Sequence, residues 1–193
     1  MTPSPSLRVL GVVVSDPART RGMSLHGQTL DARAVATVAG WCETVRVVGR
    51  DGLDPSLPLA ELCEGADVVV VHDPLCPLIT VAELADCAAA VRPGVAVCGI
   101  RPVTDTVKRV EDGVLRWTLD RDLLAVLASP VAFGRDLVQP LALRLSTAGH
   151  LGDLMGLAGA LEQVGALCGV PVPSAGRRVS DAEDLAVLAL ATP

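Results

Sequence analysis

The sequence predicts an α/β protein with a three-layer α/β/α, Rossmann-like architecture. Short runs of β-branched residues alternate, through the first half of the chain, with Ala- and Leu-rich stretches of helical periodicity. This β-α-β-α order is typical of a parallel sheet with helices on both faces. With 193 residues and no linker-like segment, we expect one domain spanning residues 1–193 with its own core.

Four apolar runs are predicted as buried strands: Leu7–Val14, Thr44–Val48, Asp67–His72 and Val95–Ile100. Helices are predicted between them, at about 28–40, 57–65 and 80–91. The third helix has a clear start, because Thr80 is followed by Glu83 in a capping-box arrangement. Such sheets bind ligands at the carboxyl ends of their strands. Asp16 and Asp73 follow two of these ends.

After Pro102 the pattern changes to strict alternation. Val103–Val110 has a period of two, Glu111-Asp112-Gly113 is a turn signal, and Val114–Leu119 alternates again. The segment predicts a β-hairpin arm at about 102–119. Because an isolated hairpin is at best marginally stable in water, we expect the arm to pack against a second copy of the chain in a homodimer.

The remainder is predicted to be mostly helical, at about 134–145 and 153–165, with a short strand near Cys168–Val172. A last helix is expected to start at Ser180, where Glu183 would complete a second capping box, and to end near Ala191.

Composition argues against several classes of partner. The net charge is −6 and the aromatic residues are Trp41, Trp117 and Phe133 alone, so neither phosphate-backbone binding nor base stacking is favoured. No apolar run approaches the ~20 residues of a membrane span, and no basic segment precedes Val9–Val14. A cytoplasmic protein that binds neither nucleic acid nor membrane is expected.

The six cysteines show no metal-ligand spacing. We interpret them as reduced core thiols, with Cys76 as the exception because it lies in the loop after Asp73.

Five short motifs occur in a fixed order: VHD at 71–73, PVTDTVKR at 102–109, TLDR at 118–121, SPVAF at 129–133 and SDAEDLAVL at 180–188. This order resembles the 2-C-methyl-D-erythritol 4-phosphate cytidylyltransferase family of the non-mevalonate (methylerythritol phosphate) pathway of isoprenoid biosynthesis. The resemblance covers roughly residues 67–190. It implies a nucleotidyltransferase (GT-A-like) fold in which the hairpin is a dimerisation arm.

The resemblance also implies a reaction and its residues. The family transfers the cytidylyl group of CTP to methylerythritol phosphate and expels pyrophosphate, with Mg²⁺ as cofactor. Asp73 matches the aspartate of the VHD motif and is expected to bind substrate and metal. Arg178 falls where the family has the catalytic lysine of its NxK motif.

In the acceptor segment, Thr104, Asp105, Lys108 and Arg109 are expected to bind substrate, and the resemblance implies that a basic residue at Arg109 reaches the acceptor phosphate across the dimer. Two other interpretations stay open. Asp105 could instead hold the hairpin through backbone hydrogen bonds. Lys108 and Arg109 could instead protect a sheet edge from pairing.

The nucleotide half departs from the family pattern. The family begins with an AAGxGxR loop followed by PKQ, whereas Ser15-Asp16-Pro17 follows the first strand here, and Lys108 is the only lysine in the chain. Glycines would let backbone amides approach a triphosphate, and Pro17 removes a donor. Ser15, Asp16 and Arg19 remain as the expected nucleotide contacts, with Arg21 as a catalytic replacement for the loop arginine.

Three functions are compatible with this pattern. The first is a cytidylyltransferase with impaired activity. The second is a catalytically inactive, dimeric binding or regulatory homologue. The third is a nucleotidyltransferase that acts on a different phosphorylated substrate. Loss of several phosphate donors weakens nucleotide binding, so we expect CTP to bind poorly.

Overall fold

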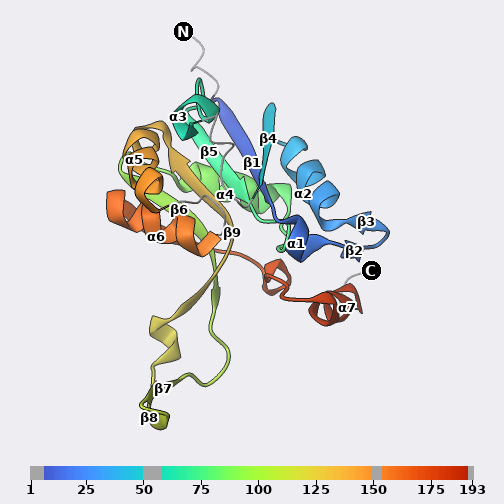
Figure 1. Cartoon of the computed structure of the whole chain (residues 1–193), viewed down its shortest axis with the longest axis vertical. Helices are drawn as coiled ribbons and strands as arrows, with labels where there is room; N and C mark the ends of the chain where they lie inside the picture. Colours follow the sequence, from blue (N-terminus) through green and yellow to red (C-terminus); the bar gives the residue numbers. More distant parts are fainter. Residues whose placement is uncertain (1–6, 50–57, 149–153, 191–193) are drawn as a thin grey trace.

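The computed structural model describes residues 7–49, 58–148 and 154–190. Its centre is a six-stranded sheet in the order β10-β6-β9-β5-β1-β4, built from β1 (Val9–Ser15), β4 (Thr44–Gly49), β5 (Val68–His72), β6 (Val95–Pro102), β9 (Ala125–Gly134) and β10 (Ala166–Pro171). Figure 1 shows helices on both faces of this sheet, as the sequence predicts.

The sheet is mixed, not parallel as expected. β1 pairs in parallel with β4 and β5, and β10 pairs in parallel with β6. β9 lies antiparallel between β5 and β6, and no strand was predicted at its position. The sequence of β9 is rich in Ala and contains Pro130, so its local pattern resembles neither alternation nor a β-branched run.

Each face of the sheet carries its own core. On one face α2 (Leu30–Ala39) and α4 (Val81–Ala90) pack against the strands, and on the other lie α3 (Leu59–Leu62), α5 (Val138–Ala148) and α6 (Leu154–Val164). β5 contributes to both cores, because its sequence VVVVH is buried along its whole length. A continuous apolar run is what a strand covered on both faces requires.

Of the two capping boxes predicted from the sequence, the one at the start of α4 is present and the one at the start of α7 is replaced by another cap. α4 begins after Thr80 with the predicted capping box to Glu83. α7 (Ala182–Leu190) was expected to begin at Ser180 with Glu183 as the partner. Instead, Asp181 accepts the backbone N–H of Asp184 at 2.9 Å, so an Asp cap one residue later replaces the predicted one.

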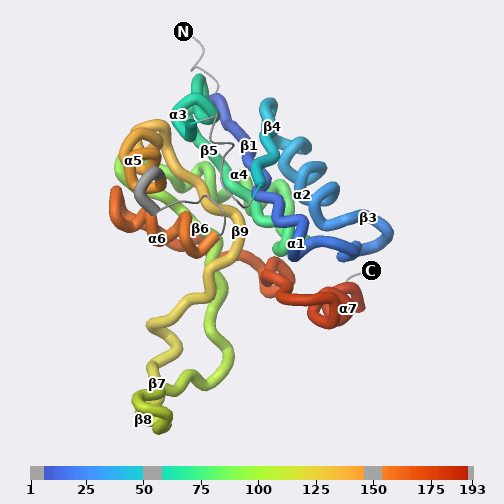
Figure 2. Tube along the Cα trace, viewed as in Figure 1, coloured from blue at the N-terminus to red at the C-terminus, as the bar shows by residue number. Residues whose placement is uncertain are grey.

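The predicted arm projects from the body of the molecule (Figure 2). β7 (Lys108–Glu111) and β8 (Val114–Thr118) form the hairpin, and the turn between them places Asp112 at φ 52° and Gly113 at φ 75°, as an Asp-Gly hairpin turn does. The strand expected from Val103 begins only at Lys108, because residues 103–107 have no strand to pair with. A 3₁₀ turn (η1, Arg121–Leu123) leads back into β9.

Smaller elements frame the carboxyl end of β1. They are α1 (Pro17–Thr20) and the ribbon of β2 (Ser24–Leu25) and β3 (Gln28–Thr29). Leu25, Leu75, Val179 and Leu185 form a third apolar cluster that joins this ribbon to α7. Two further 3₁₀ turns, η2 (Arg135–Leu137) and η3 (Ser174–Gly176), precede α5 and α7. No helix in the described ranges is long and apolar enough to cross a membrane.

Candidate active site

Asp73 follows β5 at the edge of the sheet where the sequence places it, and both of its oxygens have partners. Oδ2 accepts the Nε–H of Arg178 at 2.7 Å, and Oδ1 accepts the backbone N–H of Leu75 at 2.9 Å. The side chain is 13% exposed. The structure therefore brings together two of the predicted site residues, which are 105 positions apart in the chain.

Ser129 of β9 fixes the backbone at Asp73. Its Oγ accepts the Asp73 N–H at 3.1 Å and lies 2.7 Å from Nδ1 of His72. At Ser129, β9 also lies against Gly99 of β6, and this close approach is possible because residue 99 has no side chain. A Cβ on Gly99 would lie 2.6 Å from the Ser129 carbonyl oxygen, which is closer than real Cβ contacts allow.

His72 is a buried strand-end residue, as interpreted from the sequence. It is 1% exposed, and burial lowers its pKa to about 4 even though the neighbouring Asp73 carboxylate acts in the opposite direction. The ring is therefore neutral at physiological pH.

The segment that carries Arg178 is anchored to the loop after Asp73. The Val179 N–H donates to the Leu75 carbonyl at 2.7 Å. Gly176 packs directly on Ile79, where an added Cβ would lie 2.7 Å from the Ile79 Cδ1 atom. These contacts hold Arg178 beside Asp73. They also give a packing reason for glycine at 176, where the family motif has asparagine.

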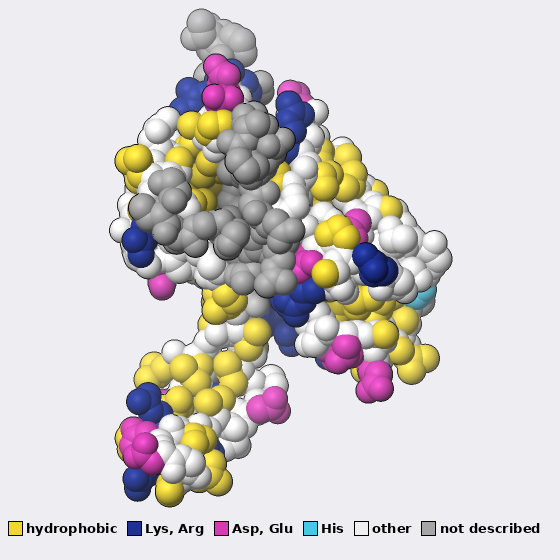
Figure 3. Space-filling view, in the orientation of Figure 1, with side chains coloured by type: hydrophobic (Ala, Val, Ile, Leu, Met, Phe, Trp, Pro, Cys, Tyr) yellow, Lys and Arg dark blue, Asp and Glu magenta, His cyan; other side chains and the backbone are white. Residues whose placement is uncertain are grey.

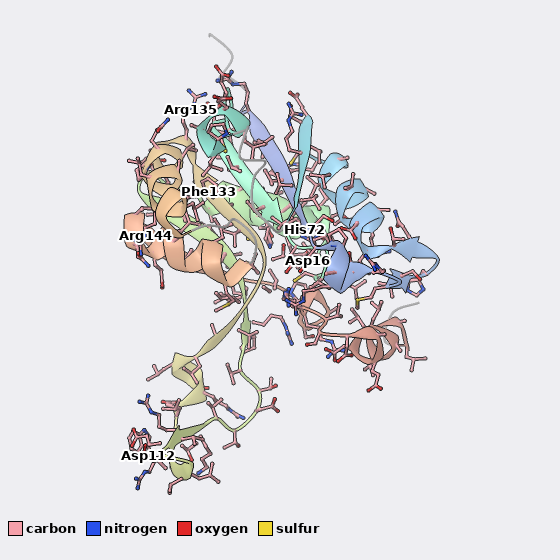
Figure 4. All side chains as sticks on the ribbon, in the orientation of Figure 1. Asp16, His72, Asp112, Phe133, Arg135 and Arg144 are labelled. Carbon is pink, nitrogen blue, oxygen red and sulfur yellow. The ribbon has the colours of Figure 1, made fainter. Side chains whose placement is uncertain are left out.

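The turn after β1 lies next to this pair. Val13 of β1 is in register with His72, and Figure 4 shows Asp16 and His72 at the same end of the sheet. Ser15 donates its hydroxyl to Asp31 Oδ1 at 2.6 Å. Arg19 and Arg21 are exposed.

The backbone amides of this turn are already hydrogen-bonded. The Ala18 N–H donates to the Asp16 side chain at 3.2 Å, and the N–H groups of Arg19 and Thr20 both donate to the Asp16 carbonyl at 2.9 Å. Asp16 therefore caps α1 from within. The three backbone N–H groups at residues 18–20, which could have donated to a phosphate, therefore all donate to Asp16.

The acceptor residues predicted on the arm, Thr104, Asp105, Lys108 and Arg109, are exposed. Figure 4 shows the arm, with Asp112 at its turn, projecting away from the end of the sheet at which His72 lies. Lys108 Nζ donates to Thr118 Oγ1 at 2.5 Å, and Arg109 forms an exposed ion pair with Glu111 at 3.4 Å. Asp105 is exposed, and the Thr104 carbonyl accepts from Arg121 at 2.8 Å.

Arg121 was not singled out in the sequence. It lines an open pocket of about 360 Å³ together with Thr106, Thr118, Leu119 and Asp120. The available signal was its position in the TLDR motif, directly after the second arm strand. The pocket makes the base of the arm a concave surface with a guanidinium and two hydroxyl groups.

The cysteine expectation was wrong at two positions, Cys76 and Cys168. Cys76 is fully buried, whereas Cys168 in the edge strand β10 is exposed. Burial raises the pKa of the Cys76 thiol to about 12. Cys76 is buried because its loop folds inward against Ile79 and Val172 in the core on the α2/α4 face.

For a magnesium ion, the Asp73–Arg178 pair offers one carboxylate, that of Asp73. No group of three or more His, Cys, Asp or Glu side chains that could hold a metal occurs within residues 7–49, 58–148 and 154–190. Mg²⁺ is commonly held by one or two carboxylates with substrate phosphates and water. Asp73 can serve as that carboxylate once its Oδ2 is released from Arg178.

Comparison with solved structures supports the fold. The structure of 4-diphosphocytidyl-2C-methyl-D-erythritol synthase from Anaerococcus prevotii matches with a TM-score of 0.73 at 17% identity, over 96% of this chain and 98% of that one. The 2-C-methyl-D-erythritol 4-phosphate cytidylyltransferase from Thermus thermophilus matches with a TM-score of 0.71, also at 17% identity, over 93% and 96% of the two chains.

Curated relatives match over shorter stretches. The 2-C-methyl-D-erythritol 4-phosphate cytidylyltransferase of Lysinibacillus sphaericus is 41% identical over 76 residues, 39% of this chain and 32% of the relative. The bifunctional enzyme IspD/IspF of Anaeromyxobacter is 37% identical over 135 residues, 67% of this chain and 32% of the relative. The match thus spans about a third of each relative.

The family model described as "IspD: 2-C-methyl-D-erythritol 4-phosphate cytidylyltransferase" matches residues 2–187. This match takes in the first turn, the Asp73–Arg178 pair and the arm. The chain therefore belongs to the 2-C-methyl-D-erythritol 4-phosphate cytidylyltransferase family.

Proposed function

We propose that the protein transfers the cytidylyl group of CTP to methylerythritol phosphate. The observation that carries the proposal is the Asp73–Arg178 pair, held at 2.7 Å beside the turn after β1. It puts one carboxylate and one guanidinium at the carboxyl end of β5, where ligands of such sheets bind. A cytoplasmic location is part of the same proposal.

In the reaction, an oxygen of the methylerythritol phosphate attacks the α-phosphorus of CTP. A new P–O bond forms, the P–O bond to the β-phosphate breaks, and its electron pair leaves with pyrophosphate. Phosphoryl transfer of this kind depends on positioning and on neutralising charge at the phosphate oxygens. In the proposed mechanism the Arg178 guanidinium donates to those oxygens, and Arg21 is a second cation from the first turn.

The proposed role of Asp73 is to bind Mg²⁺ together with substrate phosphates. When bound, the ion neutralises charge between phosphate oxygens. Release of Arg178 from the Asp73 carboxylate would accompany binding, so that the guanidinium turns from the carboxylate to the phosphates. The exchange has an energetic cost, because a charge-assisted hydrogen bond of 2.7 Å must be broken and replaced by bonds to the phosphates.

Weak binding of CTP is also part of the proposal. Ser15, Asp16 and Arg19 are the proposed nucleotide contacts, yet Ser15 is bonded to Asp31 and the amides at 18–20 are bonded to Asp16. A phosphate arriving there would compete with existing bonds and meet the negative charge of Asp16. The proposed consequence is a low affinity for CTP and slow turnover.

The proposed assembly is a homodimer formed through the arms. Side chains on the arm and its base expose large apolar surfaces, with Leu115 70%, Trp117 57% and Leu123 83% exposed. An exposed hydrophobic hairpin favours a protein partner. In the dimer, Thr104, Asp105, Lys108 and Arg109 would reach the acceptor phosphate at the partner's Asp73 site.

The test is pyrophosphate release with CTP, methylerythritol phosphate and Mg²⁺. We expect slow turnover that falls by about 10²–10³ in Arg178→Met, the loss typical of a removed charge-stabilising donor. Arg46→Met is the matched control, because Arg46 is an exposed arginine of β4 whose Nη1 donates to the adjacent Val45 carbonyl.

Two outcomes would contradict the proposal. Wild-type protein that binds methylerythritol phosphate but releases no pyrophosphate would favour the inactive binding homologue. Turnover with CTP and only a different phosphorylated alcohol would favour another substrate. Calorimetry with CTP and Mg²⁺ tests the affinity separately, and a micromolar dissociation constant would contradict weak binding.

A further inference from the structure

Arg101 lies near the end of β6, just before the chain leaves the sheet for the arm. It pairs with Val126 of β9. Cys98 and Ile100 of β6 belong to the core on the α5/α6 face, and Val97 belongs to the core on the α2/α4 face. Because side chains alternate along a strand, Arg101 shares the face of Val97, which the loop containing Cys76 and Ile79 covers.

The Arg101 guanidinium has no partner among the residues that the structure describes. Its Nε is buried without a hydrogen-bond acceptor, and the side chain makes no ion pair within the described ranges. Other partly buried arginines are bonded: Arg33 Nε donates to the Pro77 carbonyl at 2.6 Å, and Arg177 Nη2 to the Asp184 carbonyl at 3.0 Å. A buried donor without an acceptor is costly and rare.

The surroundings of Arg101 carry excess positive charge. Arg101 and Arg178 both lie close enough to the Cys76 thiol to lower its pKa, while Asp73 and, more strongly, burial raise it. The Asp73 carboxylate is already bonded to Arg178. Two guanidinium groups and one carboxylate therefore lie near the Cys76 thiol, and the carboxylate is bonded to Arg178 and not to Arg101. Figure 3 shows basic side chains gathered where the arm joins the body.

An arginine in this position suits a phosphate. The planar guanidinium presents its N–H groups as a fork that matches two phosphate oxygens, and such charge-assisted bonds are among the strongest in proteins. Because Nε is covered by protein atoms, the Arg101 side chain would turn toward the arriving phosphate, which would then supply the acceptor that Nε lacks.

We propose that Arg101, together with Arg178, binds a phosphate group at the carboxyl end of β6. Arg101 thereby contributes positive charge to a site whose first turn has no amides to spare at residues 18–20. The proposal rests on the proposed function for the identity of the ligand, which is a phosphate of CTP or of methylerythritol phosphate. The binding site itself is independent of turnover.

The test uses pyrophosphate as the probe, with calorimetry at constant ionic strength so that general screening is equal in all samples. Wild-type protein is expected to bind pyrophosphate, and Arg101→Met to bind it about 10- to 100-fold more weakly, as for loss of a hydrogen bond to a charged group. Arg101→Lys keeps the charge without the fork and should fall between them. Arg46→Met, an exposed arginine of β4, should match wild type.

Stability provides a second readout. Without phosphate, Arg101→Met should unfold at the same temperature as wild type or higher, because it removes an unpaired buried donor. Added pyrophosphate should then raise the unfolding temperature of wild type more than that of the variant. Equal pyrophosphate binding by wild type and Arg101→Met, or no binding by either, overturns the proposal. So does a variant that is destabilised without phosphate, since Arg101 would then have a structural partner.

Titration with each substrate identifies the source of the phosphate. A loss of affinity in Arg101→Met for CTP alone assigns Arg101 to the nucleotide, and a loss for methylerythritol phosphate alone assigns it to the acceptor. An effect on neither overturns the proposal. Arg101-dependent pyrophosphate binding without any turnover would support this site and refute the proposed function alone.

Discussion

Acid should destabilise this fold through His72. The imidazole is fully buried with a pKa near 4, against 6.5 for an exposed histidine. Between these values the unfolded chain binds a proton that the folded chain does not. The free energy of unfolding therefore falls as the pH falls through this window. A difference of about 2.5 pKa units corresponds to about 3 kcal/mol, lost between roughly pH 6.5 and 4.

The assay is urea unfolding of wild type and His72→Gln at a series of pH values from 7.5 to 4. Glutamine can still bond Ser129 but does not titrate, so the difference between the two pH profiles isolates the histidine. The contribution of carboxylates with lowered pKa, such as Asp67 and Asp184, cancels in that difference. We expect wild type to lose about 3 kcal/mol more than the variant.

A direct titration gives an independent check. Of the three histidines in the chain, one should remain neutral in proton NMR spectra down to about pH 5. Parallel pH profiles for wild type and His72→Gln, or three histidines that all titrate near 6.5, would refute the reasoning from burial.

Four further predictions follow from the site and the arm. Asp16→Asn keeps the cap of α1 but removes a negative charge, so CTP should bind severalfold more tightly by calorimetry; equal or weaker binding would count against that role of Asp16. Arg109→Ala should weaken binding of methylerythritol phosphate about tenfold without lowering the unfolding temperature, and unchanged affinity would leave Arg109 as a guard of the sheet edge. Trp117→Glu should shift a dimer toward monomer in light scattering, whereas a wild type of 19.8 kDa at every concentration would exclude the arm as a dimer contact. Among the six thiols, Cys168 should react first with a thiol reagent, because the other five are buried; rapid reaction of two or more thiols in the folded protein would contradict this.

The sequence was most informative about features that depend on residues close together in the chain. Thr80 and Glu83 are three residues apart and need only each other to start α4. Asp112 and Gly113 determine the arm turn through their own backbone preferences. β5 was evident because four consecutive valines suit only a strand buried on both faces.

Features that depend on contacts between segments far apart in the chain could not be predicted from the sequence. β9 is defined by its neighbours β5 and β6, and its Ala-rich sequence gives no local strand signal. Cys76 follows a strand end, as exposed loop residues often do, but its loop is covered by the Val172–Val179 region. Arg101 did carry one signal, since it directly follows the apolar strand Val95–Ile100, but its lack of a partner is a property of the folded molecule.

The site pair illustrates the same division. Asp73 could be placed at a strand end from periodicity, whereas only the order of the family motifs linked it to Arg178. No pattern in the chain indicates that residues 105 positions apart form a hydrogen bond. The closed hydrogen bonding of the turn after β1 was likewise not predictable in detail, although Asp16 and Pro17 already suggested that the amides there would not form a cradle.

The arm is continuous with β6 and β9, two neighbouring strands inside the sheet. β6 runs out into it and β9 returns from it, and along the way back β9 supplies Ser129, which grips the backbone of Asp73. Residues 103–107 and the 3₁₀ turn η1 lie between the hairpin and these two strands. A displacement of the hairpin by an associating molecule that passes through these segments into β9 would reach Ser129, and through it the backbone N–H of Asp73.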